Sequence, residues 1–202
     1  PEPREALIEA GPMLGFGGAR EVRLWLRLKQ RHEVELSYWP KGDPSKTHTL
    51  RLSAGGHDGR TLQHTLSSLT PSTTYQYELK VGGRSAHTSQ PFEFKTTPRW
   101  HRRTPPPDVV MAIGSCSYLN QYPDDTYGGE VEIFESVRAQ SPDLMLWLGD
   151  AVYLNPEDTG SREGIFRRYA SYRAHPALQA LLASTHHYAT WRARMKGVLP
   201  DG

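Results

Sequence analysis

Apolar and polar residues alternate from position 22 to position 28. The even positions are aliphatic and the odd positions are basic or aromatic: Val22, Arg23, Leu24, Trp25, Leu26, Arg27 and Leu28. A period of two residues predicts a β-strand with one buried face. The same signal recurs between turns rich in Gly, Pro, Asp and Ser, and it predicts strands at 34–38, 47–53, 61–66, 74–81 and 92–96. Short strands at this spacing predict an antiparallel, all-β sandwich over residues 1–98.

The pattern changes after a stiff, proline-rich and basic segment at 99–108, which we interpret as a linker between two domains. Two continuous apolar runs, at 109–113 and 144–148, indicate parallel strands that are buried on both faces. Apolar residues at helical spacing within 130–140 complete a strand–helix–strand unit. Residues 109–202 are therefore expected to form an α/β domain, and the chain to be multidomain. Two further helices and a last strand are predicted at 163–173, 176–183 and 187–191.

Composition excludes several classes of partner and site. The chain has 202 residues, which is enough for two domains. Its 24 basic and 22 acidic residues leave a formal charge of +2, so no concentrated positive field would attract a nucleic acid. No apolar run reaches the roughly 18 residues of a membrane helix, and the first residues lack a secretory signal pattern. We expect a soluble chain and leave its compartment open.

The chain has a single cysteine, Cys116. One thiol excludes an internal disulfide and a zinc site built from several thiolates. Cys116 is therefore a buried apolar residue, a nucleophile, or one metal ligand among other residue types.

Three side chains able to bind a cation follow the two apolar runs. Cys116 and Asp150 lie just past the predicted strand ends, and Tyr153 comes three residues after Asp150. Because parallel strands deliver their next residues to one edge of the sheet, these side chains can meet in one crevice. A thiolate, a carboxylate and a phenolate are all anionic when they bind a metal, and a phenolate favours ferric iron. The spacing thus predicts a metal site at this edge.

Tyrosines at 75 and 77 open one of the predicted strands, after a loop at 69–74. A tyrosine in this position can return its hydroxyl to the upstream backbone. The segment resembles the tyrosine corner of fibronectin type III domains, and we expect the sandwich to be of that type.

The run Gly149-Asp150-Ala151-Val152-Tyr153 matches the Gly-Asp-x-x-Tyr motif of purple acid phosphatases and related metallophosphoesterases. The wider sequence resembles the PhoD-like alkaline phosphatase D family, in which a small sandwich precedes a metallophosphatase domain. The segments that carry this resemblance are 111–116, 127–130, 133–135, 142–150, 167–169 and 176–179.

The resemblance implies a function and a role for each of the three residues. Cys116 would be an iron ligand, and Tyr153 would complete the iron side. Asp150 would bridge Fe(III) and a second divalent ion such as Ca(II), and would be the catalytic carboxylate. The implied reaction is hydrolysis of a phosphate ester by a metal-bound hydroxide.

The sequence departs from the family after Trp191. There it reads Arg-Ala-Arg-Met-Lys-Gly, where the family has Asp-Asp-His-Asp, and Ala151 replaces a frequent Asn. We therefore expect an incomplete α/β domain, weak or single-metal occupancy, and little turnover by this chain alone. An incompletely covered sheet should also expose apolar surface, through which the chain could self-associate.

The main alternative function is a non-catalytic, fibronectin-like binding module with a degenerate phosphatase remnant. Several other residues have simple structural interpretations. His186 and His187 are expected to be structural or at the surface, and the glycine-rich stretch 15–18 is expected to be a turn and not a phosphate cradle. The remaining charged pairs are expected to be solvated or at a helix surface: 102–103, 124–125 and 167–168.

Overall fold

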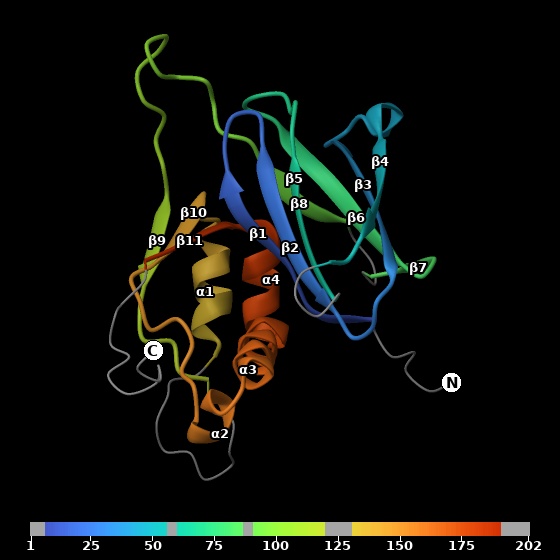
Figure 1. The fold of residues 1–202 in the computed structure, drawn as a ribbon. Coiled ribbons are helices and arrows are strands. Elements are labelled where there is room, and N and C mark those ends of the chain that lie inside the picture. Colours follow the sequence, from blue (N-terminus) through green and yellow to red (C-terminus); the bar gives the residue numbers. More distant parts are fainter. Residues whose placement is uncertain (1–6, 56–59, 87–90, 120–130, 191–202) are drawn as a thin grey trace.

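The computed structural model describes residues 7–55, 60–86, 91–119 and 131–190 (Figure 1). Its first part is a sandwich of two antiparallel sheets. One sheet has the order β1 (Ile8–Gly17), β2 (Val22–Leu28), β5 (Thr61–Leu66). The other has the order β4 (His48–Ser53), β3 (Glu33–Pro40), β6 (Thr74–Val81), β7 (Arg84–Ser85), with β8 (Phe92–Lys95) also paired to β6 and a short 3-10 helix at Pro44–Lys46.

The core of the sandwich lies between its two sheets, because alternate residues of each strand point inward. Leu24, Leu36 and Leu79 come from three different strands and are all almost fully buried. All the strands that the period-two pattern predicts are present, with bounds that differ by two residues at most. The predicted all-β sandwich is therefore confirmed.

The first strand, β1, is absent from the prediction. Its pairing with β2 shifts register three times, between Ile8 and Ala10, between Ala10 and Met13, and between Leu14 and Gly17. Each shift moves the following side chains relative to the two faces, so no regular alternation survives in the sequence.

The Tyr75 hydroxyl returns to the upstream backbone, as predicted. It accepts a hydrogen bond of 3.0 Å from the amide of Thr70. The same loop is closed by Thr96, whose hydroxyl donates to the carbonyl of Thr70 at 2.7 Å. These bonds hold the entry to β6 against the end of β8.

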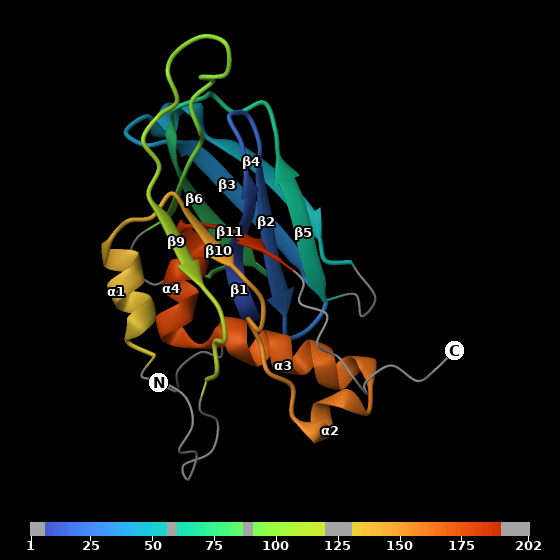
Figure 2. The same cartoon turned by 90° about the vertical axis from the view of Figure 1, so that its left-hand side faces the viewer.

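The second part of the chain is a parallel sheet with helices. The sheet order is β11 (His186–Ala189), β10 (Leu144–Trp147), β9 (Met111–Gly114). The helices are α1 (Ile133–Ala139), α2 (Pro156–Thr159), α3 (Arg162–Ala174) and α4 (Pro176–Ser184). Figures 1 and 2 show α1 and α4 side by side along the sheet, with α3 running below the sandwich. The predicted strand–helix–strand unit and both later helices are confirmed.

Local chemistry explains the helix boundaries. The Ser161 hydroxyl accepts a hydrogen bond of 3.0 Å from the amide of Gly164 and so caps α3. Pro176 is the first residue of α4, where its fixed φ suits a helix and its missing N–H costs nothing. Phe134 from α1, Trp147 from β10 and Leu181 from α4 then share one buried core.

The prediction that both apolar runs are buried on both faces is wrong. Val109, Val110, Met111 and Ile113 are each about half exposed or more, as is Leu148 at the end of the second run. β9 is the edge strand of this sheet, and its alternate residues Met111 and Ile113 are exposed. The expected exposed apolar surface is thus confirmed, and self-association through it stays a prediction.

The sandwich and the parallel sheet dock through the glycines of β1. The two ring nitrogens of His186 lie 3.2 Å from the Gly15 carbonyl oxygen and 2.9 Å from the Lys95 carbonyl oxygen. The Tyr188 hydroxyl lies 3.2 Å from both the amide and the carbonyl oxygen of Gly17. Gly15 and Gly17 are therefore strand residues at a docking surface, and their interpretation as a turn is wrong. The structural alternative for His186 is confirmed, because its side chain is buried.

A charged residue of the sandwich, Arg27, is also buried between the two parts of the chain. Arg27 points away from the sandwich core but is only 3% exposed, because α3 packs over it. Its guanidinium donates to Glu9 at 2.9 Å and to Glu163 of α3 at 3.0 Å. Arg60 contacts the same two carboxylates, at 3.4 and 2.9 Å. This network joins the two parts of the chain.

Two of the predicted charged pairs lie in described segments. Arg102 and Arg103 are exposed, as expected. Arg168 is buried and paired with Asp158, so its placement at a helix surface is wrong. The pair 124–125, Trp191 and residues 192–202 lie outside the described residues. No helix among the described segments is long and apolar enough to span a membrane.

Candidate metal centre

Cys116 and Asp150 occupy equivalent places just past two neighbouring strands. Gly114 and Trp147 are the last residues of β9 and β10 and are paired with each other. Cys116 then adopts a φ of 55° and Asp150 a φ of 48°, both in the left-handed region. A residue with a β-carbon held there stores about 1–3 kcal/mol, and such residues cluster at functional sites.

Backbone hydrogen bonds hold the two loops together beyond the sheet. The Leu148 amide donates to the Gly114 carbonyl at 2.8 Å, and the Ser117 amide donates to the Asp150 carbonyl at 3.0 Å. A longer contact of 3.4 Å joins the Cys116 amide to the Gly149 carbonyl. The chain thus continues the strand pairing past its formal end, and this sets Cys116 beside Asp150.

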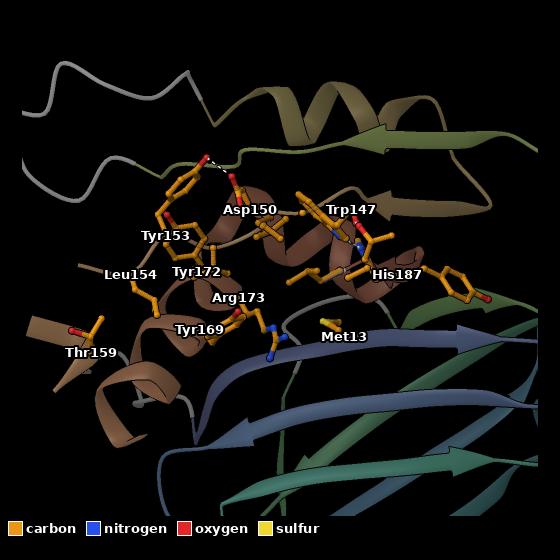
Figure 3. Close-up of a pocket in the computed structure, with 18 residues that line it drawn as sticks. Met13, Trp147, Asp150, Tyr153, Leu154, Thr159, Tyr169, Tyr172, Arg173 and His187 are labelled. Carbon is orange, nitrogen blue, oxygen red and sulfur yellow. Dashed lines mark hydrogen bonds between the residues drawn. The ribbon is translucent and has the colours of Figure 1, made fainter. Parts of the chain in front are cut away.

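Tyr153 turns back toward Asp150, as Figure 3 shows, and toward Cys116. Its hydroxyl donates to the Asp150 carboxylate at 3.5 Å and also hydrogen-bonds the Cys116 sulfur. The hydrogen bond to Cys116 is the main cause that raises the pKa of Tyr153 to about 12, followed by burial and by the negative charges of Cys116 and Asp150. The three residues named from the sequence are therefore neighbours in space.

This arrangement concentrates groups that become anionic when they bind a cation. Cys116 is exposed, so its interpretation as a buried apolar residue is wrong. In the described part of the chain, no group of three or more His, Cys, Asp and Glu residues is placed to hold a metal ion. The third member of the set at this site is the phenol of Tyr153. The donor set of sulfur, carboxylate and phenol suits one cation that tolerates anionic ligands, as ferric iron does.

A cavity of about 640 Å³ opens beside Asp150 and Tyr153. It lies between the parallel sheet, α3, α4 and the edge of β1, as Figure 3 shows. Most of its wall is apolar or aromatic, including Met13, Trp147, Leu154, Tyr169, Tyr172, Leu178 and Leu182. Its polar groups include Arg173 and His187, to which the sequence analysis gave no ligand-binding role. Arg173 gave no signal in the sequence, because it is one of several polar residues in its predicted helix.

His187 is buried and fully hydrogen-bonded as a neutral ring. The Trp147 indole donates to its Nδ1 at 3.0 Å, and its Nε2 lies 3.3 Å from the Leu181 carbonyl oxygen. Burial lowers the pKa of His187 to about 4, although the contact with Leu181 opposes this shift. The structural alternative for His187 is thus confirmed.

We expect His187 to make stability depend on pH. The folded state keeps the ring neutral down to about pH 4, whereas the unfolded chain protonates near the ordinary pKa of 6.5. The contribution is therefore complete above pH 6.5 and is lost toward pH 4, by at most about 1.4 kcal/mol per pH unit. Urea unfolding of the wild type and His187→Gln between pH 4 and 7.5 measures it. An equal pH slope in both proteins would contradict this, and the exposed His101→Gln is the control.

Comparison with known proteins gives a fold. No protein-family model and no curated protein matches the chain. Among solved structures it is similar to PhoD, with a TM-score of 0.73 and 21% identity, over 95% of this chain and 40% of that one. It is also similar to the purple acid phosphatase PPD1 from seeds of yellow lupin (Lupinus luteus), with a TM-score of 0.62 and 15% identity, over 90% of this chain and 34% of that one.

These similarities extend across both parts of the chain. At such identities they establish the fold alone, and the chain spans about 40% of the PhoD chain. The chain thus has the fold of the corresponding parts of PhoD and of a purple acid phosphatase.

Proposed function

We propose that this chain carries the iron side of a metal-dependent phosphoric ester hydrolase. The observation that supports it is the position of the Tyr153 hydroxyl, which faces both the Cys116 sulfur and the Asp150 carboxylate. Cys116, Asp150 and Tyr153 would hold Fe(III). Asp150 would also reach a second divalent ion, for which we propose Ca(II). The solved structures with this fold include a purple acid phosphatase, which agrees with a phosphate ester as substrate.

The finer architecture belongs to the same proposal. We assign residues 1–98 to a fibronectin type III-like domain, 99–108 to a linker and 109–202 to the first portion of a metallophosphatase domain. In this arrangement the sandwich supports the catalytic part through β1, and the linker lies away from the site.

When bound, such ions would act as Lewis acids on a phosphate oxygen and lower the pKa of a water from 15.7 to roughly 7. The protein residues would supply charge and geometry. Tyr153 and Cys116 must each lose a proton to become ligands, because a metal binds the phenolate and the thiolate. With its pKa raised to about 12, Tyr153 is protonated in the metal-free chain at neutral pH. Loading with iron should therefore release its proton to solvent.

The second ion has a weaker site in this chain. Among the described residues at this edge, Asp150 is its proposed protein ligand, and a carboxylate alone holds Ca(II) poorly because that ion takes six to eight oxygen ligands. We therefore propose single-metal occupancy and little turnover for the isolated chain.

Metal analysis of the purified chain tests this proposal. After incubation with Fe(III) and removal of excess metal, we expect about one iron ion per chain and a purple colour from the iron–phenolate bond. Cys116→Ser should lower the iron content, and Tyr153→Phe should remove the colour as well. Ser117→Ala, next to the site, is the matched control and should leave both unchanged.

Two outcomes would overturn the proposal in different ways. A colourless protein whose iron content is unchanged in both variants would refute the metal centre and favour a non-catalytic binding module. Two tightly bound metals together with robust phosphatase activity would refute the single-metal occupancy.

A further inference from the structure

Arg173 is a positively charged residue that lines the cavity and has no carboxylate partner among the described residues. It lies in the last turn of α3, and its guanidinium stacks on Trp25 of β2 at 4.5 Å and on Tyr169 at 5.4 Å from the ring centres. Within the described segments, its guanidinium forms no ion pair and no hydrogen bond. Arg173 is partly buried, and this burial lowers its pKa. An arginine nevertheless stays charged at neutral pH.

The two arginines that are buried among the described residues, Arg27 and Arg168, are paired with carboxylates. Arg27 contacts Glu9 and Glu163, and Arg168 contacts Asp158 at 2.5 Å. This is the usual arrangement, because a desolvated charge is costly unless an opposite charge compensates it. Aromatic stacking stabilises a guanidinium but leaves its N–H donors available. Arg173 thus combines a half-buried charge with unused donors at the wall of a cavity.

The position of Arg173 within the cavity indicates what could use those donors. Figure 3 shows Asp150 and Tyr153 on one side and Arg173 on the other, facing β1 and β2. Apolar side chains such as Leu178 and Leu182 line the space around them. A volume of about 640 Å³ is within the range of small-molecule sites.

We propose that Arg173 binds a second anionic group of the substrate, whose apolar organic part fills this cavity. The inference rests on the proposed function and names its substrate class: a phosphate ester with an apolar or aromatic alcohol portion that carries a further phosphate or carboxylate. The planar guanidinium matches the two oxygens of either group. Arg173 is then a substrate-binding residue that acts at a distance from the reacting phosphorus.

Binding of 1-naphthyl phosphate to the metal-free chain tests this proposal independently of iron and of turnover. In the absence of metal, the phosphate of this probe should contact Arg173 and its rings the apolar wall. Isothermal titration calorimetry measures Kd for the wild type, Arg173→Met and Arg173→Lys. We expect Arg173→Met to weaken binding by at least about tenfold and Arg173→Lys to retain part of it.

Controls separate binding from folding. The exposed Arg31→Gln variant should bind as the wild type does, and thermal unfolding shows whether Arg173→Met is folded at the titration temperature. 1-Naphthol, which lacks the anionic group, should bind about equally weakly to the wild type and to Arg173→Met. An unchanged Kd in a folded Arg173→Met, or naphthol binding as tightly as the phosphate, would overturn the proposal even if iron binding succeeds.

Discussion

Gly17→Ala is expected to destabilise the chain by about 3 kcal/mol. A β-carbon at this position would overlap the imidazole of His186, so either the ring or β1 must move. Movement of the ring breaks its contacts with the Gly15 and Lys95 carbonyls. Buried polar groups would then lose their partners, which adds to the cost of overpacking. The free energy of unfolding in urea measures this loss.

Gly15→Ala is the matched control, two residues earlier in the same strand. Its new β-carbon would meet Arg23 at 3.6 Å, which is an ordinary van der Waals distance. Its stability should change by less than about 1 kcal/mol. If both alanine variants unfolded at the same urea concentration, the close approach of His186 to Gly17 would not be what docks the parallel sheet on the sandwich.

Asp158→Ala is expected to cost about 3–5 kcal/mol, because it removes the buried carboxylate that compensates the buried charge of Arg168. Asp158 accepts from the Arg168 guanidinium at 2.5 Å and from the Asn155 amide at 2.9 Å. Burial alone would raise its pKa, but these hydrogen bonds and the positive charge of Arg168 outweigh burial and lower it. The stabilisation is therefore complete above the ordinary pKa of 3.8 and is lost as the pH falls through the lowered value.

Glu157→Ala is the matched control, because it removes an exposed carboxylate partner of Arg168 and leaves the buried one in place. Glu157 contacts the same arginine, at 3.9 Å, but its side chain is 57% exposed. Solvent screens such a pair, and its loss should cost no more than about 1 kcal/mol. Thermal and urea unfolding at pH 7 measure both variants. Equal losses for the two would contradict the assignment of the buried ion pair to Asp158.

Local patterns in the sequence were sufficient for much of the fold. The alternation around Leu24 and Leu36 predicts strands correctly, because a strand with one buried face needs only its own residues to show which side faces the core. The sequence also indicated that Cys116 and Asp150 can meet if their two strands are neighbours, and the structure shows that the strands are paired. Parallel strands end at a common edge, so two residues that follow adjacent strands must lie near each other whatever surrounds them.

Contacts between distant segments were decided only by the tertiary structure. Arg27 and Arg168 look like surface residues in the sequence, but both are buried. Glu163 of α3, far along the chain, pairs with Arg27, and Asp158 of α2 pairs with Arg168. Gly17 looks like part of a turn, but it is a strand residue that pairs with Val22, and His186 from the other part of the chain packs against it. Periodicity reports which way a side chain points relative to its own element. What meets that side chain there depends on how the elements pack, and no local pattern encodes this.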